Sequence, residues 1–308
     1  MTSAETIKEV TRQHLKKGGV VLGQCLTAVG WVGGTVPEMR EEDGLIELAM
    51  SDVSNGGVAV GLALAGRRPI YIVRYQGFQW YNAAFIVNYA ARSKEMWGVP
   101  CPVFIRSIGM DGSGPVTSGL HHSLFTRMPG IPVCAPMTPG EYQRAWDHFV
   151  SHDDPLCVSE HRLGFPVDCE MPDSVQDEAD VTLFAISATR LNALEAAKVL
   201  KHEGVVCNVI HLFWLKPFVV TDGMKKALAA SRHGGLVLDG DFEGGVVKTI
   251  AHDINEATGS PMRVLGLEER TPGYAPHLDN AAPSAGRICE FVRNIVRKPS
   301  AHQQQRLS

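Results

Sequence analysis

Apolar and polar residues alternate along the chain in a way that predicts strands and helices in turn. Short apolar runs, typical of strands buried on both faces, lie at residues 20–22, 70–73, 103–105, 132–135 and 156–159. Helical patterns lie between them, at residues 57–65, 81–97 and 139–151. Thr138 is expected to cap the last helix, with Pro139 at its first position. This alternation indicates an α/β protein with a mostly parallel sheet flanked by helices.

A polar segment at residues 167–180 interrupts the pattern and contains four Asp and two Glu residues. The alternation of strand and helix patterns resumes after this segment, with strands expected at residues 181–186, 206–212 and 235–239. A helix is expected at residues 191–202, with one apolar face formed by Leu191, Leu194, Ala197 and Leu200. A chain of 308 residues has room for about two domains. We therefore predict two α/β domains, residues 1–175 and 176–308.

Charge and composition exclude several classes of function. The net charge is -4 and the pI is near 6.3, which argues against binding to nucleic acid or to an anionic membrane. The chain has no apolar run long enough for a membrane span and no secretory h-region near Met1, so a cytoplasmic location is expected. Its seven cysteines are scattered without a CxxC pair, which predicts buried, reduced thiols without a disulfide framework or zinc site.

Two segments follow predicted strands and contain candidate functional residues. Residues 109–123 (GMDGSGPVTSGLHHS) form a Gly- and Ser-rich loop that ends in His121 and His122, and one of these could act as an acid or base. A solvated, flexible loop is the alternative. Residues 75–81 (YQGFQWY) combine aromatic rings with two glutamines, which suits a half-polar pocket for a flat ligand. The alternative is that these rings belong to the core.

Two acidic segments have simpler alternatives. Asp52 stands just before a helix of small residues, where either Asp52 or Ser54 could cap the helix. Residues 239–245 (DGDFEGG) superficially resemble a metal loop, but they lack EF-hand spacing, so no metal ligand is predicted in this chain. The chain also lacks a P-loop and a proper Rossmann glycine motif.

The ordered set of motifs resembles the beta subunit of the thiamine-diphosphate-dependent first component of 2-oxo acid dehydrogenases. The resemblance, to the pyruvate and branched-chain type within the transketolase-like superfamily, runs from about Gly18 to Val296. In the first half it rests on VVLGQCLTAVGWVGG, SDVSNGGVAVGLALAGRRPI, NYAARS, GLHHS and DDPLCVSEHRL. In the second half it rests on HLFWLKPF, DGDFEGG and RTPGYAPHLDNAAPS.

This resemblance implies a pyrimidine-binding domain over residues 1–175 and a transketolase C-terminal-type domain over residues 176–308. It implies thiamine diphosphate and Mg²⁺ as cofactors. In the family, a GDG motif followed by asparagine holds the diphosphate and the metal, and this chain has no such stretch. The resemblance therefore implies an alpha-type partner subunit that carries this motif, in a heterotetramer of two alpha and two beta chains. An acyltransferase with a lipoyl carrier is a further partner that it suggests.

The resemblance also implies roles for individual residues. Asp52 falls where the family has a glutamate that hydrogen-bonds the aminopyrimidine, and it is one methylene shorter. Phe78 falls where an aromatic ring lies against the aminopyrimidine, and His122 falls at the active-site histidine that contacts substrate. His121 is a second candidate for substrate contact. Gln24 is a third candidate and stands where many relatives have an acidic residue.

Three functions remain open at this point. The first is a beta-type subunit that acts on a 2-oxo acid, with decarboxylation and acyl or aldehyde transfer. The second is half of a split transketolase that transfers a two-carbon ketol unit, whose phosphate-bearing donors would need arginine at the pocket. The third is a non-catalytic partner that stabilises an alpha subunit, with Asp52 acting only as a cap. The arginines available for phosphate are Arg74, Arg92, Arg106, Arg127 and Arg162.

Overall fold

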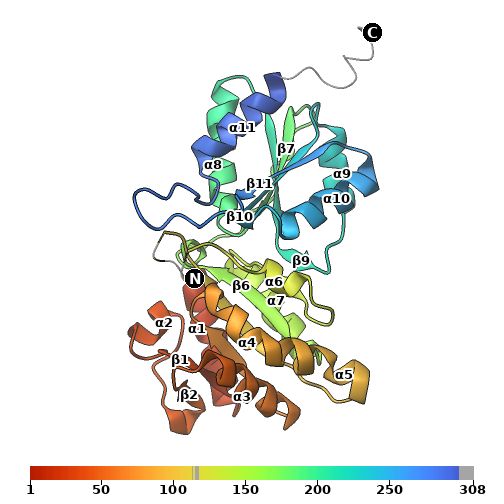
Figure 1. Cartoon of the computed structure of the whole chain (residues 1–308). Helices are drawn as coiled ribbons and strands as arrows, with labels where there is room; N and C mark the ends of the chain where they lie inside the picture. The colour runs from red at the N-terminus through yellow and green to blue at the C-terminus, as the bar shows by residue number, and fades with distance from the viewer. Residues whose placement is uncertain (113, 115–117, 298–308) are drawn as a thin grey trace. The chain divides into compact units, whose positions relative to one another are not determined.

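A computed structural model describes residues 1–112, 114 and 118–297, and the chain divides into two compact units (Figure 1). The first unit contains Met1–Glu170 together with Phe213–Pro217 and Gly273–Pro276, and the second contains the rest of the described residues. The units therefore interleave along the sequence. The boundary between residues 175 and 176 stays a prediction of the sequence.

Within the described residues, the first unit is built on a seven-stranded sheet with strand order β2-β1-β3-β4-β6-β5-β9. All neighbouring strands are parallel except β9, which pairs antiparallel with β5. The strands are β1 (Val21–Gln24), β2 (Leu45–Leu48), β3 (Ile70–Val73), β4 (Phe104–Gly109), β5 (Val133–Cys134), β6 (Leu156–His161) and β9 (Trp214–Lys216).

The helices of the first unit include two with clear N-terminal capping boxes. Thr2 and Glu5 cap α1 (Ser3–Lys16), and Thr138 and Glu141 cap α7 (Pro139–Ser151), as the sequence predicted for Thr138. A nearly continuous helical stretch runs through α4 (Gln79–Phe85), a π-helical segment (Ile86–Ala90) and α5 (Ala91–Trp97). The other α-helical elements are α2 (Gly30–Gly34), α3 (Asp52–Leu64) and α6 (Ser123–Thr126).

The second unit is a parallel sheet with helices on both faces. Its strand order is β11-β10-β7-β8, formed by β7 (Val181–Ile186), β8 (Cys207–Leu212), β10 (Gly235–Phe242) and β11 (Met262–Leu267). Figure 1 shows α8 and α11 on one side of this sheet and α9 and α10 on the other. These helices are α8 (Thr189–His202), α9 (Asp222–Ala229), α10 (Val246–Thr258) and α11 (Ala285–Arg297). The predicted α/β class with mostly parallel sheets is confirmed in both units.

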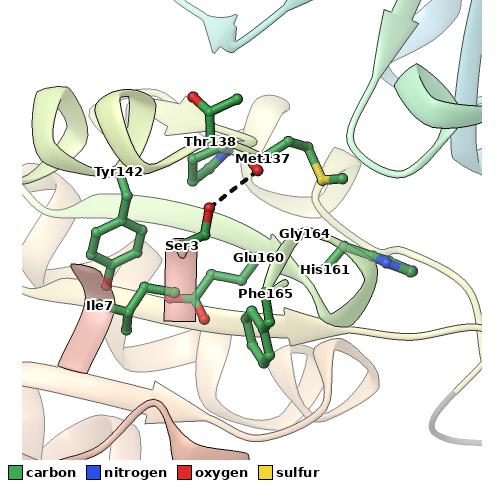
Figure 2. Close-up of a pocket in the computed structure, with 10 residues that line it drawn as sticks. Ser3, Ile7, Met137, Thr138, Tyr142, Glu160, His161, Gly164 and Phe165 are labelled. Atoms are coloured by element: carbon green, nitrogen blue, oxygen red, sulfur yellow. Dashed lines mark hydrogen bonds between the residues drawn. The ribbon is translucent and has the colours of Figure 1, made fainter. Parts of the chain in front are cut away.

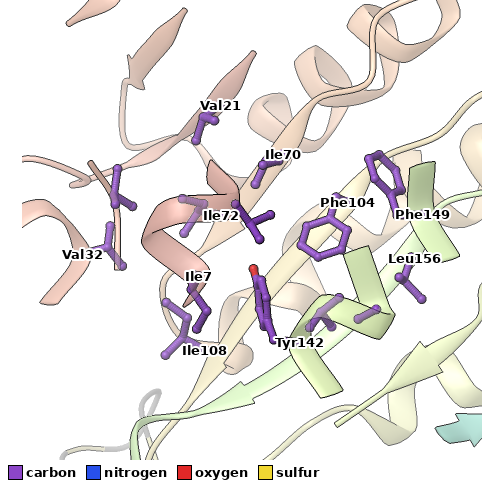
Figure 3. Close-up of a cluster of buried hydrophobic side chains, with 14 of the residues drawn as sticks. Ile7, Val21, Val32, Ile70, Ile72, Phe104, Ile108, Tyr142, Phe149 and Leu156 are labelled. Carbon is purple, nitrogen blue, oxygen red and sulfur yellow. The ribbon is translucent and has the colours of Figure 1, made fainter. Parts of the chain in front are cut away.

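The core of the first unit fills one face of its sheet. Alternate strand residues point to opposite faces, and Ile70, Ile72 and Phe104 point to the face that α1 and α7 cover (Figure 3). Tyr142 and Phe149 of α7 pack edge-on or tilted against Phe104, with ring centroids 6.0 and 5.1 Å away. Aromatic packing of this kind is among the larger contributions to a core.

A buried ion pair lies on the same face of the sheet. Arg106 of β4 donates from Nε and Nη2 to both carboxylate oxygens of Glu160 in β6, at 2.7 and 2.9 Å, and from Nη2 to Thr35 Oγ1. Neither charged side chain is more than 2% exposed. Burial alone would lower the pKa of Arg106, but the Glu160 carboxylate outweighs it and keeps the pKa above its usual value.

Glu160 also lines a small cavity beside the ion pair. Figure 2 shows Glu160 together with Ser3 and Ile7 of α1 and Tyr142 of α7 around this cavity. Ser3 Oγ donates a hydrogen bond to the carbonyl oxygen of Met137. This bond links the start of α1 to the segment before α7. The cavity therefore belongs to the packing of α1 against the sheet.

Several sequence predictions need correction. The buried face of α8 is formed by Ala193, Ala196 and Leu200, whereas Leu191 and Leu194 are only partly buried. Cys169 is exposed and Cys25 is half-buried, so two of the cysteines are not core thiols. Strands β2, β9 and β11 and helices α1, α9, α10 and α11 were not predicted.

Among the described residues, no helix combines the length and apolarity that a membrane span requires.

The ion pair leads to a prediction for stability. Glu160→Gln leaves the Arg106 guanidinium buried without a counter-charge, so we expect the free energy of unfolding to fall by about 3–5 kcal/mol. Urea unfolding followed by far-UV circular dichroism measures this change. Glu38→Gln is the control, because Glu38 pairs with Lys8 at the surface and we expect no measurable change there. Equal stabilities of the two variants would contradict the prediction.

Candidate functional site

The candidate residues of the first unit gather at one edge of its sheet. Strands β1, β3, β4 and β6 are parallel, so their carboxyl ends meet at the same edge. Gln24 is the last residue of β1, Arg74 follows β3, and His161 is the last residue of β6. Ligands of open α/β sheets bind outside the carboxyl ends of the strands. This edge is therefore the expected position of a ligand site.

Asp52 and Gln24 form a hydrogen-bonded pair at this edge. Gln24 Nε2 donates to Asp52 Oδ1 at 2.5 Å, and Gln24 is only 7% exposed. Burial raises the pKa of the half-buried Asp52 carboxyl, whereas the hydrogen bond from Gln24 acts in the opposite direction. Ser51 is the N-cap residue of α3, so the suggestion that Asp52 or Ser54 occupies the cap is wrong.

Tyr71 and Asn82 connect Asp52 with the segment around Phe78. The pKa of Tyr71 is raised by burial and by the nearby Asp52 carboxylate, while a hydrogen bond with Asn82 acts to lower it. Asn82 Nδ2 donates to the carbonyl oxygen of Phe78 at 3.1 Å. Gly56 of α3 permits this arrangement, because a Cβ there would lie 2.8 Å from the carbonyl oxygen of Asn82.

Gln76 organises a second group of residues around the two histidines. Its Nε2 donates to Ser159 Oγ at 2.7 Å and to the Ser107 carbonyl oxygen at 3.1 Å, while its Oε1 accepts from the backbone N–H of His121 at 2.8 Å. His122 Nδ1 lies 3.0 Å from the same Ser159 hydroxyl, and its side chain is fully buried. His122 is therefore held in a fixed orientation.

His121 has a different environment from His122. It is only partly buried, and its Nδ1 accepts from Trp80 Nε1 at 3.4 Å, with the two rings edge-on. The histidines end the loop predicted from residues 109–123, of which residues 113 and 115–117 lie outside the described residues. The described part of this loop is bonded to the sheet edge through Gln76 and Ser159, so these histidines are not simply solvated.

The segment at residues 75–81 buries its glutamines more deeply than two of its aromatic rings. Gln76 and Gln79 are buried, and Gln79 Nε2 donates to Ser107 Oγ. In contrast, Trp80 and Tyr81 are 60% and 55% exposed. The glutamines thus form the interior of the segment and two of its aromatic rings lie outside, so these two rings are not core residues.

The structure therefore forms two groups from the predicted residues. Gln24 and Asp52 belong to one group, His121 and His122 belong to the other, and Phe78 lies at the end of the short 3-10 helix (Gln76–Phe78) between them in sequence. Sequence analysis missed the residues that support these groups. A sequence signal for them existed, because Gln76 and Gln79 interrupt an aromatic run directly after a buried strand. The supporting residues are Tyr71, Gln76, Gln79, Asn82, Ser107 and Ser159.

The acidic segment at residues 239–245 is not a loop where it begins. Asp239 and Asp241 belong to β10 of the second unit, and both are buried. Asp241 Oδ1 accepts a hydrogen bond from the backbone N–H of Phe242 at 2.8 Å. The DGDF part of the motif is therefore the end of a central strand.

Comparison with known proteins agrees with this two-unit architecture. Residues 18–166 match the transketolase pyrimidine-binding domain, and residues 173–288 match the transketolase C-terminal domain. A solved structure described as a split-gene transketolase in an inactive beta4 tetramer superposes with a TM-score of 0.71. The superposition covers 96% of this chain and 98% of that chain at 18% identity, so it shows the shared fold. Fold and domain content define a protein of the transketolase type.

Among proteins of this type, the chain is similar to curated beta subunits of two enzymes. The pyruvate dehydrogenase E1 component subunit beta of Rickettsia felis is 26% identical over 275 residues, which cover 82% of this chain and 83% of the relative. The acetoin:2,6-dichlorophenolindophenol oxidoreductase subunit beta of Cupriavidus necator is 29% identical over 195 residues, covering 58% and 57% of the two chains. The chain therefore belongs to the proteins that combine a transketolase pyrimidine-binding domain with a transketolase C-terminal domain, and these two relatives are both described as beta subunits.

The residues of the edge fit an aminopyrimidine, which is the part of thiamine diphosphate that the first domain of this family receives. Gln24 Oε1 is buried and has no hydrogen-bond partner among the described residues. Next to this acceptor stands the Asp52 carboxyl, which can donate when protonated and accept when ionised. Phe78 provides an aromatic ring in the adjacent segment. A flat ring with amino and ring-nitrogen groups would satisfy these partners.

The raised pKa of Asp52 leads to a prediction about pH. A carboxyl whose pKa is higher in the folded state binds more protons when folded, so it contributes stability at low pH that is lost as the pH rises through its folded-state pKa. In Asp52→Asn this contribution disappears. We therefore expect wild type to lose more stability than Asp52→Asn between about pH 4 and pH 7.

Urea midpoints at several pH values measure this difference. Asp147→Asn is a control, because Asp147 is an exposed carboxylate on α7. Parallel pH profiles for wild type and Asp52→Asn would show that the Asp52 pKa is not raised.

Proposed function

We propose that this chain is the beta-type subunit of a two-component enzyme that decarboxylates a 2-oxo acid and transfers the resulting acyl or aldehyde unit. The observation that carries the proposal is the Asp52–Gln24 pair, with its short hydrogen bond, raised carboxyl pKa and unsatisfied Gln24 oxygen. Family membership supports the same reaction class. Thiamine diphosphate, when bound, supplies the carbon nucleophile and the electron sink for such reactions.

The chain's own residues bind and orient the aminopyrimidine in this proposal. Asp52 exchanges a proton with the ring nitrogen, and the raised pKa brings its carboxyl closer to neutral pH, where such exchange is most effective. Gln24 positions Asp52 and offers its free oxygen to an amino group. Phe78 provides a flat surface for the ring. Asp52 thereby does the work of the longer family glutamate.

His122 acts on the substrate side. Its ring is buried and Nδ1 contacts the Ser159 hydroxyl, which Gln76 holds from the other side. A histidine fixed in this way can hold or move a proton at Nε2 while keeping one orientation. His121 and Gln24 are further candidates for substrate contact, with His121 placed by Trp80 and by Gln76.

An alpha-type subunit completes the site in this proposal and holds the diphosphate and Mg²⁺, in an assembly of two alpha and two beta chains. The support is a set of exposed apolar side chains on the packed helices α3, α4 and α5 and their flanks, which we call the α3–α5 face. Groups of exposed large apolar side chains are typical of protein interfaces. Two members of the face adjoin the candidate residues, because Val53 directly follows Asp52 and the Trp80 ring contacts His121. Its members are Met50, Val53, Val58, Leu64, Trp80, Tyr81, Tyr89, Met96, Trp97 and Val99.

A split transketolase that transfers a two-carbon ketol unit is the second candidate. Arg74 and Arg162 favour it, because both lie at the carboxyl edge of the sheet and neither has a carboxylate partner within the described residues. The first candidate would pass its acyl unit to an acyltransferase with a lipoyl carrier, whereas the second would pass its ketol unit to a sugar.

The role of Asp52 leads to a direct prediction. In the complex with its alpha-type subunit, Asp52→Ala should lower kcat by about 10²- to 10⁴-fold while the complex still assembles, because the proton-exchanging group is lost. Turnover of a panel of 2-oxo acids and ketose donors measures the loss. Asp147→Ala, on the exposed surface of α7, should leave turnover unchanged. Unchanged turnover in Asp52→Ala would remove Asp52 from the mechanism and favour a non-catalytic partner.

Calorimetric titration of thiamine diphosphate with Mg²⁺ tests the cofactor and the partner separately. We expect binding to the co-expressed complex and none to this chain alone, since the chain lacks the GDG motif. Binding to this chain alone would contradict the partner-held diphosphate. An absence of binding in both samples would contradict the enzymatic proposal.

The α3–α5 face leads to a prediction about assembly. Val58→Glu or Tyr89→Glu places a charge within an apolar contact, so association with the alpha-type subunit should weaken by about a hundredfold or more. Native mass spectrometry and sedimentation measure the assembly, and circular dichroism confirms that the variants fold. Val219→Glu, on an exposed loop of the second unit, should assemble normally. Normal assembly of both face variants, or loss of a beta-only oligomer alone, would overturn this assignment of the face.

A further inference from the structure

Two guanidinium groups lie over one aromatic ring at the carboxyl edge of the first sheet. Arg74 directly follows β3, and its Cζ lies 4.8 Å from the centroid of the Tyr75 ring. Arg162 follows β6, and its Cζ lies 5.7 Å from the same centroid. Arg74 Nη2 also donates to the Tyr75 hydroxyl at 3.0 Å. Two strands that are not neighbours thus place two positive charges on one ring.

These positive charges are not neutralised within the described residues. The structure shows no carboxylate partner for either guanidinium there, and Arg74 Nε is buried without a hydrogen-bond partner. Two acidic side chains at this edge have other partners, because Glu160 pairs with Arg106 and Asp52 accepts a hydrogen bond from Gln24. A buried N–H without a partner costs free energy, and an anion would satisfy it.

The ring that carries the two charges also contacts the candidate site. The Tyr75 and Phe78 rings lie edge-on with their centroids 6.0 Å apart. A group bound by Arg74 and Arg162 would therefore be separated from Phe78 by the Tyr75 ring. The other candidate arginines lie elsewhere, because Arg106 is fully buried in its ion pair, and Arg92 and Arg127 belong to α5 and to the end of α6 and do not directly follow a strand.

We propose that Arg74 and Arg162 form an anion subsite that binds a phosphate or carboxylate group of the substrate, separate from the atoms that react. This inference rests on the proposed function and specifies its substrate class, an anionic chain that extends from the reacting carbonyl past Phe78 to Tyr75. Guanidinium groups suit this role, since they stay charged and donate paired hydrogen bonds to oxyanions. Tyr75 holds both groups in place through cation–π contacts.

The subsite is tested with inorganic phosphate and with malonate, at constant ionic strength, without thiamine diphosphate. Phenylglyoxal modification, mapped by peptide mass spectrometry, reports the access of each arginine in the full chain. We expect phosphate or malonate, but not equal ionic strength of chloride, to protect Arg74 and Arg162 while Arg92 stays reactive. Stronger protection by phosphate identifies a phosphorylated substrate, and stronger protection by malonate identifies a substrate with a further carboxylate.

Variants give a second and independent measurement. Arg162→Gln should weaken binding of the protecting anion, measured by calorimetry, by about tenfold or more, and Arg162→Lys should recover part of it. Arg74→Gln should do the same, with circular dichroism as a check on folding. Arg92→Gln is the matched control and should bind the anion like wild type. In turnover assays of the assembled complex, Arg162→Gln should raise KM for the anionic substrate and leave kcat nearly unchanged.

The outcomes separate this subsite from the proposed function. Lack of protection by either anion, or equal protection of Arg92, would overturn the subsite. Anion binding that is lost in Arg162→Gln supports the subsite even where the co-expressed complex fails to bind thiamine diphosphate. That second failure would count against the proposed function alone.

Discussion

The two-residue alternation of β4 and β6 is the constraint on which the first unit depends. In these strands Arg106 and Glu160 point to one face of the sheet, and Ser107 and Ser159 point to the other. The first face contains the ion pair under α1 and α7, and the second supports Gln76 and His122. Since adjacent residues serve opposite faces, a shift of register by one residue would exchange the two environments.

The same alternation explains how a reactive edge and a stable core coexist. The two buried charges neutralise each other, and Arg106 donates a further hydrogen bond to Thr35, so the ion pair links β4 to β6. On the opposite face, neutral amides and hydroxyls position the histidines, and the only carboxylate among the predicted site residues, Asp52, is half-buried. The separation allows the pKa of Asp52 to be set by burial and by Gln24, with the Glu160 charge committed to Arg106.

Much of the fold could be predicted from the pattern of apolar residues. Buried strands such as β3 and β7 are continuous apolar runs, and the capping box at Thr138 marks the start of α7. Strand β2 escaped prediction because its burial is partial, and β9 because it is a three-residue edge strand whose pairing depends on β5, far away in sequence. The positions of Asp52, Phe78 and His122 came from the resemblance. Their partners Gln76 and Ser159 depend on contacts across 83 residues, which no local pattern reveals.

Strand β9 has a consequence for how this chain can be divided. It lies after β8 in sequence and yet completes the sheet of the first unit by pairing with the short strand β5. A fragment that stops at Glu170 would retain every parallel strand of that sheet but would leave one side of β5 open. Open strand edges recruit other chains. The first unit is thus complete only as part of a longer polypeptide, and a gene split between the two halves would have to leave this strand with its sheet.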